Sequence, residues 1–520
     1  MNLDVFLSYC LPLLACWFGS AILEFFYKPQ IRPLWKRSCL VITIHLLLFL
    51  LIYVLFLLIT QRALFSMTAS LCLASIVLII NNVKYATLRE PLVFSDFFLY
   101  LQIFQHPRFY LPFLGAKLLA LLLIVCAGVI FAGFSLEKAL FSLLSLEALF
   151  FLGLLVSLLY LLSRLCTKVF VSIDLEKDCG LLGVLVTVCV YAYKAPKFRK
   201  KLYQTFTDET AFSEQRINNL PKKKLLADIV VVQSESFFDA RNLDSNILEG
   251  VLSEYDTCLN SSEAFGKLEV PAWGANTMRT EFGFLTGLTP KQLGLAQFYP
   301  YQQLADGVPS IVAALKACGY HCICIHPNAA NFFMRDKFFK QLGFDEFLDE
   351  TAFEGAVRKG PYIADEAVTE KIIQVSKNRD DKPCFIFAIT MENHGPLHLE
   401  SLEKNEWADY YKKKPDVKLN DLTIYLRHLN NADRMIAQLC EFFTQKEREV
   451  IFSLYGDHVP AISHIFELME YSDPRSNYFI WSSSEGKYAD VRESPRERVL
   501  KIEALGLYLL DLISHKASRH

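Results

Sequence analysis

Two hydrophobic patterns divide the chain near residue 195. Before that point lie five nearly continuous apolar runs, at residues 5–26, 40–60, 63–80, 114–134 and 140–162. Each run, as a helix, is long enough to cross a hydrocarbon core of about 30 Å. The first run lacks a basic start and a small-residue cleavage site, which favours a retained span over a signal peptide. The pattern predicts a helical transmembrane domain of about five spans at residues 1–163.

The orientation of these spans depends on two signals that disagree. Five spans with a cytoplasmic start place the rest of the chain on the outer face of the membrane. The loop that carries Lys28, Arg32, Lys36 and Arg37 would then also face outward, although basic loops favour the cytoplasm. A sixth, short crossing at residues 180–193 is the alternative, but this stretch is short for a span. We therefore predict five spans, with six as the alternative.

A connector at residues 164–224 follows, with two basic runs at 197–201 and 222–224. Such runs are usually solvated, and beside a bilayer they also attract anionic lipid headgroups. After it, short apolar strands alternate with amphipathic helices. Strands are expected at 228–233, 321–325, 384–389, 449–454 and 478–481, and helices at 308–317, 364–376 and 420–443. This alternation predicts an α/β domain with a largely parallel central sheet at residues 225–520.

Composition supports a membrane protein and says little about a ligand. Hydrophobic residues make up 53% of the 520 residues, and the mean hydropathy of +0.27 is high for a soluble protein. A formal net charge of −2 provides no overall attraction to nucleic acid. Six cysteines follow residue 225, an even number that would permit disulfides in an oxidising compartment without showing that they form: Cys258, Cys318, Cys322, Cys324, Cys384 and Cys440.

Polar side chains follow the ends of four expected strands. Glu235 follows the first strand, His326 the second and His394 the third, and the pair Asp457-His458 follows the fourth. In an open α/β sheet, ligands bind at the carboxyl ends of the strands. Carboxylate oxygens and imidazole nitrogens suit a hard or borderline divalent ion such as Mn²⁺, Mg²⁺ or Zn²⁺. We therefore predict a metal site that includes Glu235, Asp457 and His458.

The candidate nucleophile is Thr277, in a Gly-containing turn at residues 273–282 just ahead of an expected amphipathic helix. A threonine hydroxyl is a poor nucleophile unless a base or a metal activates it. We expect Thr277 to fill the remaining position of the metal site.

With these motifs, the chain resembles the lipoteichoic acid synthase and phosphoglycerol transferase family, membrane-bound members of the alkaline phosphatase and sulfatase superfamily. The resemblance covers most of the chain. It rests on Ser-Glu-Ser at 234–236, Thr277 four residues before Glu281-Phe282, Asn393-His394, and Tyr-Gly-Asp-His at 455–458. The Cys/Ser-x-Pro-x-Arg element of arylsulfatases is absent around Thr277.

The resemblance implies a role for each candidate residue. The residues that it implies as ligands of one divalent ion, Mn²⁺ by preference, are Glu235, Thr277, Asp457 and His458. It also implies that Thr277 is the nucleophile, that Arg335 binds phosphate, and that His326 and His394 bind substrate. An arginine and two imidazoles suit a phosphodiester whose negative charge must be held during attack. His394 acts either as a general acid or base, or only in binding.

The reaction implied is transfer of a phosphoglycerol headgroup from phosphatidylglycerol to a hydroxyl of a cell-envelope glycan or polymer, through a phosphothreonine. The implied location is the bacterial cytoplasmic membrane, with the catalytic domain on its outer face. Phe333, Met334 and the sequence at 273–276 differ from lipoteichoic acid synthases, which leaves the acceptor open. A phosphoethanolamine transferase, a headgroup hydrolase and a non-enzymatic sensor are the alternatives.

Overall fold

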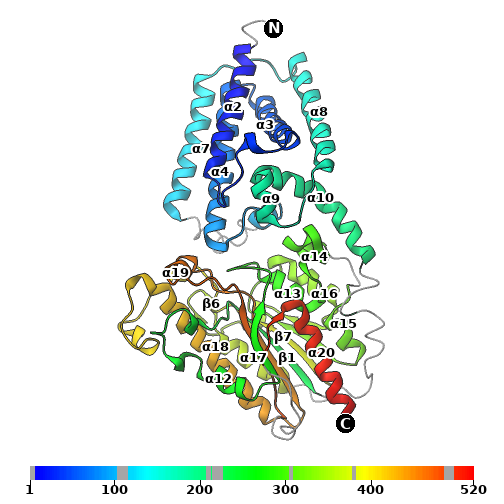
Figure 1. Cartoon of the computed structure of the whole chain (residues 1–520), viewed down its shortest axis with the longest axis vertical. Coiled ribbons are helices and arrows are strands. Elements are labelled where there is room, and N and C mark those ends of the chain that lie inside the picture. The colour runs from blue at the N-terminus through cyan, green and yellow to red at the C-terminus, as the bar shows by residue number, and fades with distance from the viewer. Residues whose placement is uncertain are drawn as a thin grey trace. The chain divides into compact units, whose positions relative to one another are not determined.

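The computed structural model describes residues 6–101, 115–205, 212, 227–303, 308–377, 382–484 and 497–519 (Figure 1). The chain forms two compact units, residues 1–199 and 200–520. The basic run at 222–224 and the predicted boundary at 224 lie outside the described residues. The domain boundaries drawn from the sequence therefore stay predictions.

The N-terminal unit is built from long apolar helices. Within the described part of the chain, five are long and apolar enough to cross a bilayer: Leu7–Phe26, Cys39–Thr60, Ala63–Leu88, Lys117–Leu136 and Leu146–Lys168. In Figure 1 they include α2 (Leu11–Leu23), α3 (Cys39–Thr60), α4 (Ala63–Leu88), α7 (Ala116–Leu136) and α8 (Leu146–Lys168). Helix α3 packs against α4 and α8, and α2 packs against α4. The predicted five-span membrane domain is confirmed.

The stretch at 180–193 is not among the candidate spans that the described residues contain. It is divided between α9 (Leu175–Leu182) and α10 (Val184–Thr205) by Gly183, whose φ is +87°. The positive φ disfavours a residue with a side chain here, and a Cβ would also lie 2.3 Å from Nη1 of Arg37, so the Arg37 side chain would have to shift. Val186 and Val190 are fully buried and pack in one apolar cluster with residues of α3 and α8.

The C-terminal unit contains an eight-stranded sheet in the order β10-β2-β9-β8-β1-β7-β3-β4. Strand β1 pairs in parallel with β7 and β8, and β3 pairs in parallel with β7 and β4, whereas β9 is antiparallel to both β8 and β2. The strands are β1 (Asp228–Ser234), β2 (Ala264–Glu269), β3 (His321–Ile325), β4 (Glu346–Leu348), β7 (Cys384–Ile389), β8 (Val450–Gly456), β9 (Ser476–Ser482) and β10 (Leu500–Lys501). The predicted α/β class and largely parallel sheet are confirmed.

Helices cover both faces of this sheet (Figure 1). On one face α18 (Asn420–Thr444) packs against α12 (Ser253–Asn260) and α17 (Asp365–Lys377), and on the other α13 (Thr277–Thr286) packs against α15 (Ile311–Ala317) and α20 (Ile502–Arg519). Val230 and Val232 share a core with α18, whereas the ring of Phe284 stacks on Phe387. Strands β1, β7 and β8 are consequently buried along their whole length, as parallel strands usually are.

The register brings the carboxyl ends of four neighbouring strands to one edge. Ser234 is opposite Gly456, Gln233 is opposite Ile389, and Ile325 is opposite Ala388. The residues that follow β1, β3, β7 and β8 therefore leave the sheet at the same level. This is the edge at which open α/β sheets bind their ligands.

Candidate active site

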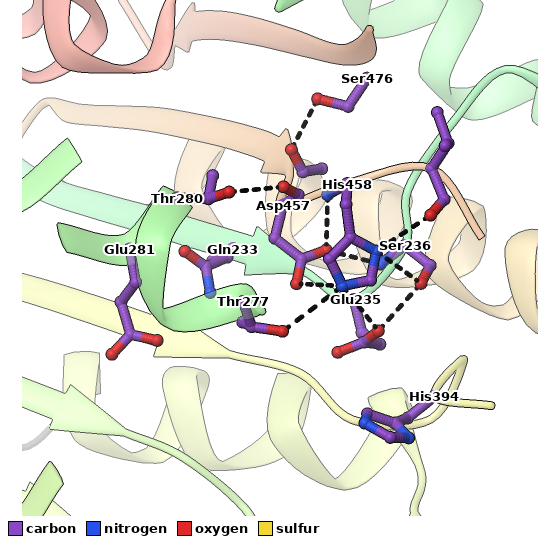
Figure 2. Close-up of polar contacts among 12 residues, drawn as sticks. Gln233, Glu235, Ser236, Thr277, Thr280, Glu281, His394, Asp457, His458 and Ser476 are labelled. Carbon is purple, nitrogen blue, oxygen red and sulfur yellow. Dashed lines mark hydrogen bonds and ion pairs between the residues drawn. The ribbon is translucent and has the colours of Figure 1, made fainter. Parts of the chain in front are cut away.

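Three buried side chains from two strand ends converge at this edge (Figure 2). One ligand atom from each of Glu235, Asp457 and His458 lies within 4.8 Å of the others, a distance that a single metal ion can bridge. Nε2 of His458 lies 3.2 Å from Oδ2 of Asp457 and 3.6 Å from Oε1 of Glu235. The structure thus brings together the three ligands predicted from the strand ends, whose role as ligands remains a proposal.

Hydrogen bonds from the backbone fix the orientation of this group. The backbone N–H groups of Ser236 and His458 both donate to Oδ1 of Asp457, at 2.8 and 2.9 Å. The Ser236 hydroxyl lies 2.9 Å from Oε1 of Glu235 and donates to it. Nδ1 of His458 lies 3.0 Å from the carbonyl oxygen of Val459. Because a carbonyl only accepts, the proton is on Nδ1 and the lone pair of Nε2 faces the two carboxylates.

This arrangement fits a divalent cation. Oδ2 of Asp457 is buried and has no hydrogen-bond donor among the described residues, a costly state for a carboxylate oxygen. Burial, and then the neighbouring Asp457 charge, raise the pKa of Glu235 above its ordinary value. A cation would give Oδ2 of Asp457 a partner and would stabilise the charged form of Glu235. It would also accept the lone pair of Nε2 of His458. Two carboxylate oxygens and one imidazole nitrogen suit Mn²⁺, Mg²⁺ or Zn²⁺.

Thr277 faces the same group from α13. Its Oγ1 lies 3.4 Å from Nε2 of His458, and it is the first residue of the helix, where partial positive charge favours an anion. The preceding Asn276 has φ of +65°, a left-handed conformation that asparagine tolerates better than most residues. The helix was expected to be amphipathic, but all ten of its residues are buried, because α20 and the sheet cover it on different sides.

Arg335 lies close to this group, but much of its guanidinium is already hydrogen-bonded to other side chains. Nη2 of Arg335 donates to Oε2 of Glu281 at 2.8 Å, and Nε lies 3.1 Å from the other carboxylate oxygen. Nη1 donates to Nε2 of His326 at 3.1 Å. A guanidinium has five N–H groups, so these contacts leave part of it for a phosphate. The Arg335 charge also lowers the pKa of Glu235, although less than burial raises it.

His326 was predicted to bind substrate, and in the structure it contacts Arg335. The side chain is fully buried. Burial first, and then the Arg335 charge, lower the pKa of His326 well below its ordinary value. A neutral imidazole accepts the Arg335 hydrogen bond through Nε2. His326 therefore supports Arg335, and direct contact with a substrate stays a prediction.

His394 lies on the loop that follows β7, below Glu235 and Thr277 in the view of Figure 2. Its Nδ1 lies 2.7 Å from the carbonyl oxygen of Gly395 and 3.1 Å from the hydroxyl of Tyr362. The carbonyl assigns the proton to Nδ1 and leaves the lone pair on Nε2. This tautomer suits a group that accepts a proton, the general-base role that the sequence left open.

Two parts of the site were not predicted as functional. Glu281 was noted only as part of a motif, and the structure shows it holding Arg335 and accepting a short hydrogen bond from the Tyr301 hydroxyl. The spacing of four residues from Thr277 on one helix was the available signal, since such residues share a face. Thr280 is also accounted for, because its hydroxyl donates to the Asp457 carbonyl at 2.7 Å.

A hydroxyl beside a candidate cation site, with an arginine and a histidine nearby, suits nucleophilic attack on a phosphorus or sulfur ester. A membrane-spanning unit precedes it in the chain. These features define a class of membrane-bound esterase or transferase with an α/β catalytic unit.

Comparison with known proteins identifies the family. The Sulfatase family model matches residues 227–498, more than half of the chain. The chain therefore belongs to the sulfatase family, and it is a membrane-bound member of the alkaline phosphatase and sulfatase superfamily, as the sequence motifs predicted. The membership makes it an enzyme of a metal-dependent superfamily.

The proteins that are similar to this chain include two relatives and one solved structure. The capsular polysaccharide biosynthesis protein RkpI of Rhizobium meliloti is 31% identical over 255 residues, which is 48% of this chain and 44% of that protein. Lipoteichoic acid synthase 1 of Bacillus subtilis is 25% identical over 150 residues, 27% of this chain and 21% of that protein. The chain thus matches less than half the length of either relative.

The solved structure is the lipooligosaccharide phosphoethanolamine transferase A of Neisseria meningitidis, an integral membrane protein. It matches 98% of this chain and 96% of its own, with a TM-score of 0.58 and 12% sequence identity. At this identity the similarity shows a common fold that includes the membrane helices.

Proposed function

We propose that this protein transfers a phosphoglycerol headgroup from phosphatidylglycerol to a hydroxyl of a cell-envelope glycan or polymer. One observation carries the proposal: the hydroxyl of Thr277 lies beside the buried group of Glu235, Asp457 and His458, at the edge of the sheet. In a family of ester-cleaving enzymes, such a hydroxyl is the natural nucleophile.

In the first step, Oγ1 of Thr277 attacks the phosphorus of the lipid. An Oγ1–P bond forms, the bond between phosphorus and the glycerol oxygen of diacylglycerol breaks, and the proton that the Thr277 hydroxyl gives up is balanced by the proton that this oxygen takes up. The start of α13 favours negative charge on Oγ1. The remaining N–H groups of Arg335 hold the phosphoryl oxygens, and Glu281 keeps the guanidinium in position.

In the second step, the acceptor hydroxyl attacks the phosphothreonine. Its oxygen bonds to phosphorus, the Oγ1–P bond breaks, and Thr277 is regenerated. Nε2 of His394 takes the proton of the acceptor hydroxyl, a role that the proton on Nδ1 permits. Water in place of the acceptor would give hydrolysis by the same chemistry.

The divalent ion would be held by Glu235, Asp457 and His458, with Thr277 as the fourth ligand. Such an ion lowers the pKa of a hydroxyl and neutralises charge on the phosphoryl group. Mn²⁺ is our proposal for its identity.

The donor and acceptor are inferred from similarity. Lipoteichoic acid synthases, which the motifs around Thr277 and Asp457 resemble, support a phosphoglycerol donor. The similarity to a capsular polysaccharide biosynthesis protein supports a glycan acceptor. A lipid donor also suits a chain with five candidate membrane spans. We place the protein in the bacterial cytoplasmic membrane, with its catalytic domain on the outer face.

The test uses the full chain in vesicles with phosphatidylglycerol labelled in its headgroup. We expect wild-type protein to move the label into a glycan or polymer, and Thr277→Ala to lower that rate by at least about 10³-fold, because no oxygen remains to attack. Thr286→Ala, at the other end of the same helix, is the matched control for loss of a buried threonine hydroxyl, because its hydroxyl donates to the Phe282 carbonyl at 2.8 Å within the helix.

The other results of this assay each lead to a different conclusion. Unchanged transfer by Thr277→Ala contradicts the nucleophile and the mechanism. Label in free glycerol phosphate alone identifies a hydrolase. A parallel assay with labelled phosphatidylethanolamine identifies a phosphoethanolamine transferase if only that label moves. No turnover of either lipid by the wild type contradicts the proposed function.

A further inference from the structure

A buried histidine on α18 lies between two glutamates that flank the His394 loop. His428 is 1% exposed. Its Nδ1 lies 2.8 Å from Oε1 of Glu392, and its Nε2 lies 3.1 Å from each carboxylate oxygen of Glu400. An ionised carboxylate only accepts hydrogen bonds, so both ring nitrogens carry protons. The geometry is that of an imidazolium shared by two carboxylates.

The surrounding charges keep this histidine protonated. Burial alone would lower its pKa, but the hydrogen bonds to Glu392 and Glu400 outweigh it and raise the pKa of His428 to about 9. From α18, Arg427 lies 3.5 Å from Glu400 and 3.3 Å from Glu406. From α17, Asp365 faces Glu392, and burial together with Glu392 raises its pKa well above the ordinary value.

The two glutamates bracket His394 in the sequence: Glu392 precedes it by two residues and Glu400 follows it by six. Glu392 is held further by the side chain of Asn431, at 2.5 Å, and by the backbone N–H of Asp365, at 2.7 Å. Because Asn431 follows His428 by almost one helical turn, both contacts come from the same face of α18. The segment 392–400 is therefore a loop whose two ends are tied to one rigid helix.

The same contacts reach toward the metal ligands. The side chain of Thr390 hydrogen-bonds Asp365 and accepts the backbone N–H of Glu235 at 3.0 Å. A continuous set of buried polar contacts thus joins α18, the His394 loop and the end of β1. A change at His428 can displace His394 without any contact between the two side chains.

We propose that His428 is a positioning residue: as an imidazolium it ties Glu392 to Glu400, closes the loop between them and holds His394 in place for phosphoryl transfer. The inference rests on the proposed function, whose acceptor step it deepens. A neutral imidazole has one N–H for two carboxylates, so loss of the proton breaks one of the two contacts. The two ends of the loop are then no longer held together, and His394 is no longer held in its position.

The test compares pH profiles of kcat and KM for the full chain in vesicles. We expect wild-type kcat to fall as the pH rises through about 9. His428→Gln should lower kcat at neutral pH at least about tenfold, with a smaller change in KM, because the base is displaced by a fraction of an ångström. In this variant kcat should also no longer fall as the pH rises through this range. His464→Gln, whose side chain is 59% exposed, is the matched control and should follow the wild type.

A second variant keeps the proposal testable if His428→Gln does not fold. Glu400→Gln removes one carboxylate and leaves the Glu392 contact, so the pKa of His428 should drop and the alkaline fall should move to lower pH. Wild-type kcat in His428→Gln, or an alkaline fall that stays in place in Glu400→Gln, overturns the proposal.

Thermal unfolding provides a readout that does not need turnover. Folding raises the pKa of His428, so its contribution to stability is complete below the ordinary histidine pKa of about 6.5 and is lost as the pH rises through about 9. The difference in Tm between wild type and Glu400→Gln should shrink across this window. Suppose that the wild type transfers no headgroup but that the difference in Tm shrinks as described. The proposed function is then wrong, whereas the protonated state of His428 is supported. A difference in Tm that stays constant across this pH window contradicts a protonated His428.

Discussion

At the scale of single residues, Glu281 connects the proposed nucleophile, Thr277, to the arginine that we propose binds phosphate, Arg335. It lies on the face of α13 that also carries Thr277, and both its oxygens contact the guanidinium of Arg335. Glu281 is fully buried and Arg335 is 2% exposed. Because a buried charge without its partner is strongly unfavourable, removing either member should cost far more than removing a surface ion pair.

We expect Glu281→Gln to lower the free energy of unfolding by about 3–5 kcal/mol and to reduce headgroup transfer, since it leaves the Arg335 charge buried without a counterion. The measurement is chemical denaturation of the full chain in detergent, with the lipid assay in parallel. Glu249→Gln is the matched control: Glu249 is 79% exposed and pairs with Arg241 at 3.5 Å, so its loss should cost about 0–1 kcal/mol. Equal stability of the two variants would refute the role of the buried pair.

At the scale of secondary-structure elements, the close approach of β8 to the turn after β1 decides where Asp457 lies. Gly456 ends β8, and a Cβ there would lie 2.0 Å from the carbonyl oxygen of Phe237 and 3.1 Å from Cβ of Ser476. The backbone cannot yield as a flexible side chain would. The missing side chain at this position therefore lets β8 deliver Asp457 and His458 beside Glu235.

Gly456→Ala should push β8 away from the turn at 237, with a loss of at least about 1–3 kcal/mol in the free energy of unfolding and a strong loss of activity. Thermal unfolding and the lipid assay measure the two effects. Gly250→Ala is the control, because nothing lies within 4 Å of a Cβ at that position. Wild-type stability and activity in Gly456→Ala would mean that the ligand group does not depend on this contact.

At the scale of the whole molecule, the basic loop before the second span bears on orientation. Arg37 is buried, and its Nη2 lies 2.7 Å from Oε2 of Glu24. The positive-inside rule counts Lys and Arg and does not depend on net charge, so this ion pair leaves the preference of the loop for the cytoplasm in place, and the outward position rests on the number of spans. An odd number of spans then supports opposite sides for the two ends of the chain.

We expect a phosphatase reporter fused after His520 to be active only outside the cytoplasm, and the same reporter before Met1 to be inactive. The reason is that the described residues contain five candidate spans between the ends. Reporter activity in cells that express each fusion is the measurement. A cytoplasmic reporter after His520 would contradict an outward-facing catalytic domain, and with it the access to an envelope glycan.

The described residues contain no disulfide, and in the catalytic unit Sγ of Cys258 lies 3.9 Å from Sγ of Cys440. Cys322 and Cys324 are buried in β3, as expected for packing residues.

The sequence was sufficient to predict the five spans, the α/β class and the central strands, because these depend on local patterns: apolar runs of spanning length and short buried strands between helices. It did not reveal β2, β4 or β10, which are short or polar and become strands only by pairing with neighbours. It also predicted that Glu235, Asp457 and His458 lie together, since parallel strands end at a common edge, whereas Thr277 was added to this group from the family resemblance.

Tertiary structure alone decided how the remaining side chains are used. Residues far apart in the sequence decide whether the guanidinium of Arg335 is available to a phosphate or paired with Glu281. They also decide whether His326 faces a substrate or Arg335. The same holds for His428, which a sequence shows only as one histidine in a helix. Its charge is set by two glutamates that the fold brings to either side of it, and hydrogen bonds of this kind have no local pattern.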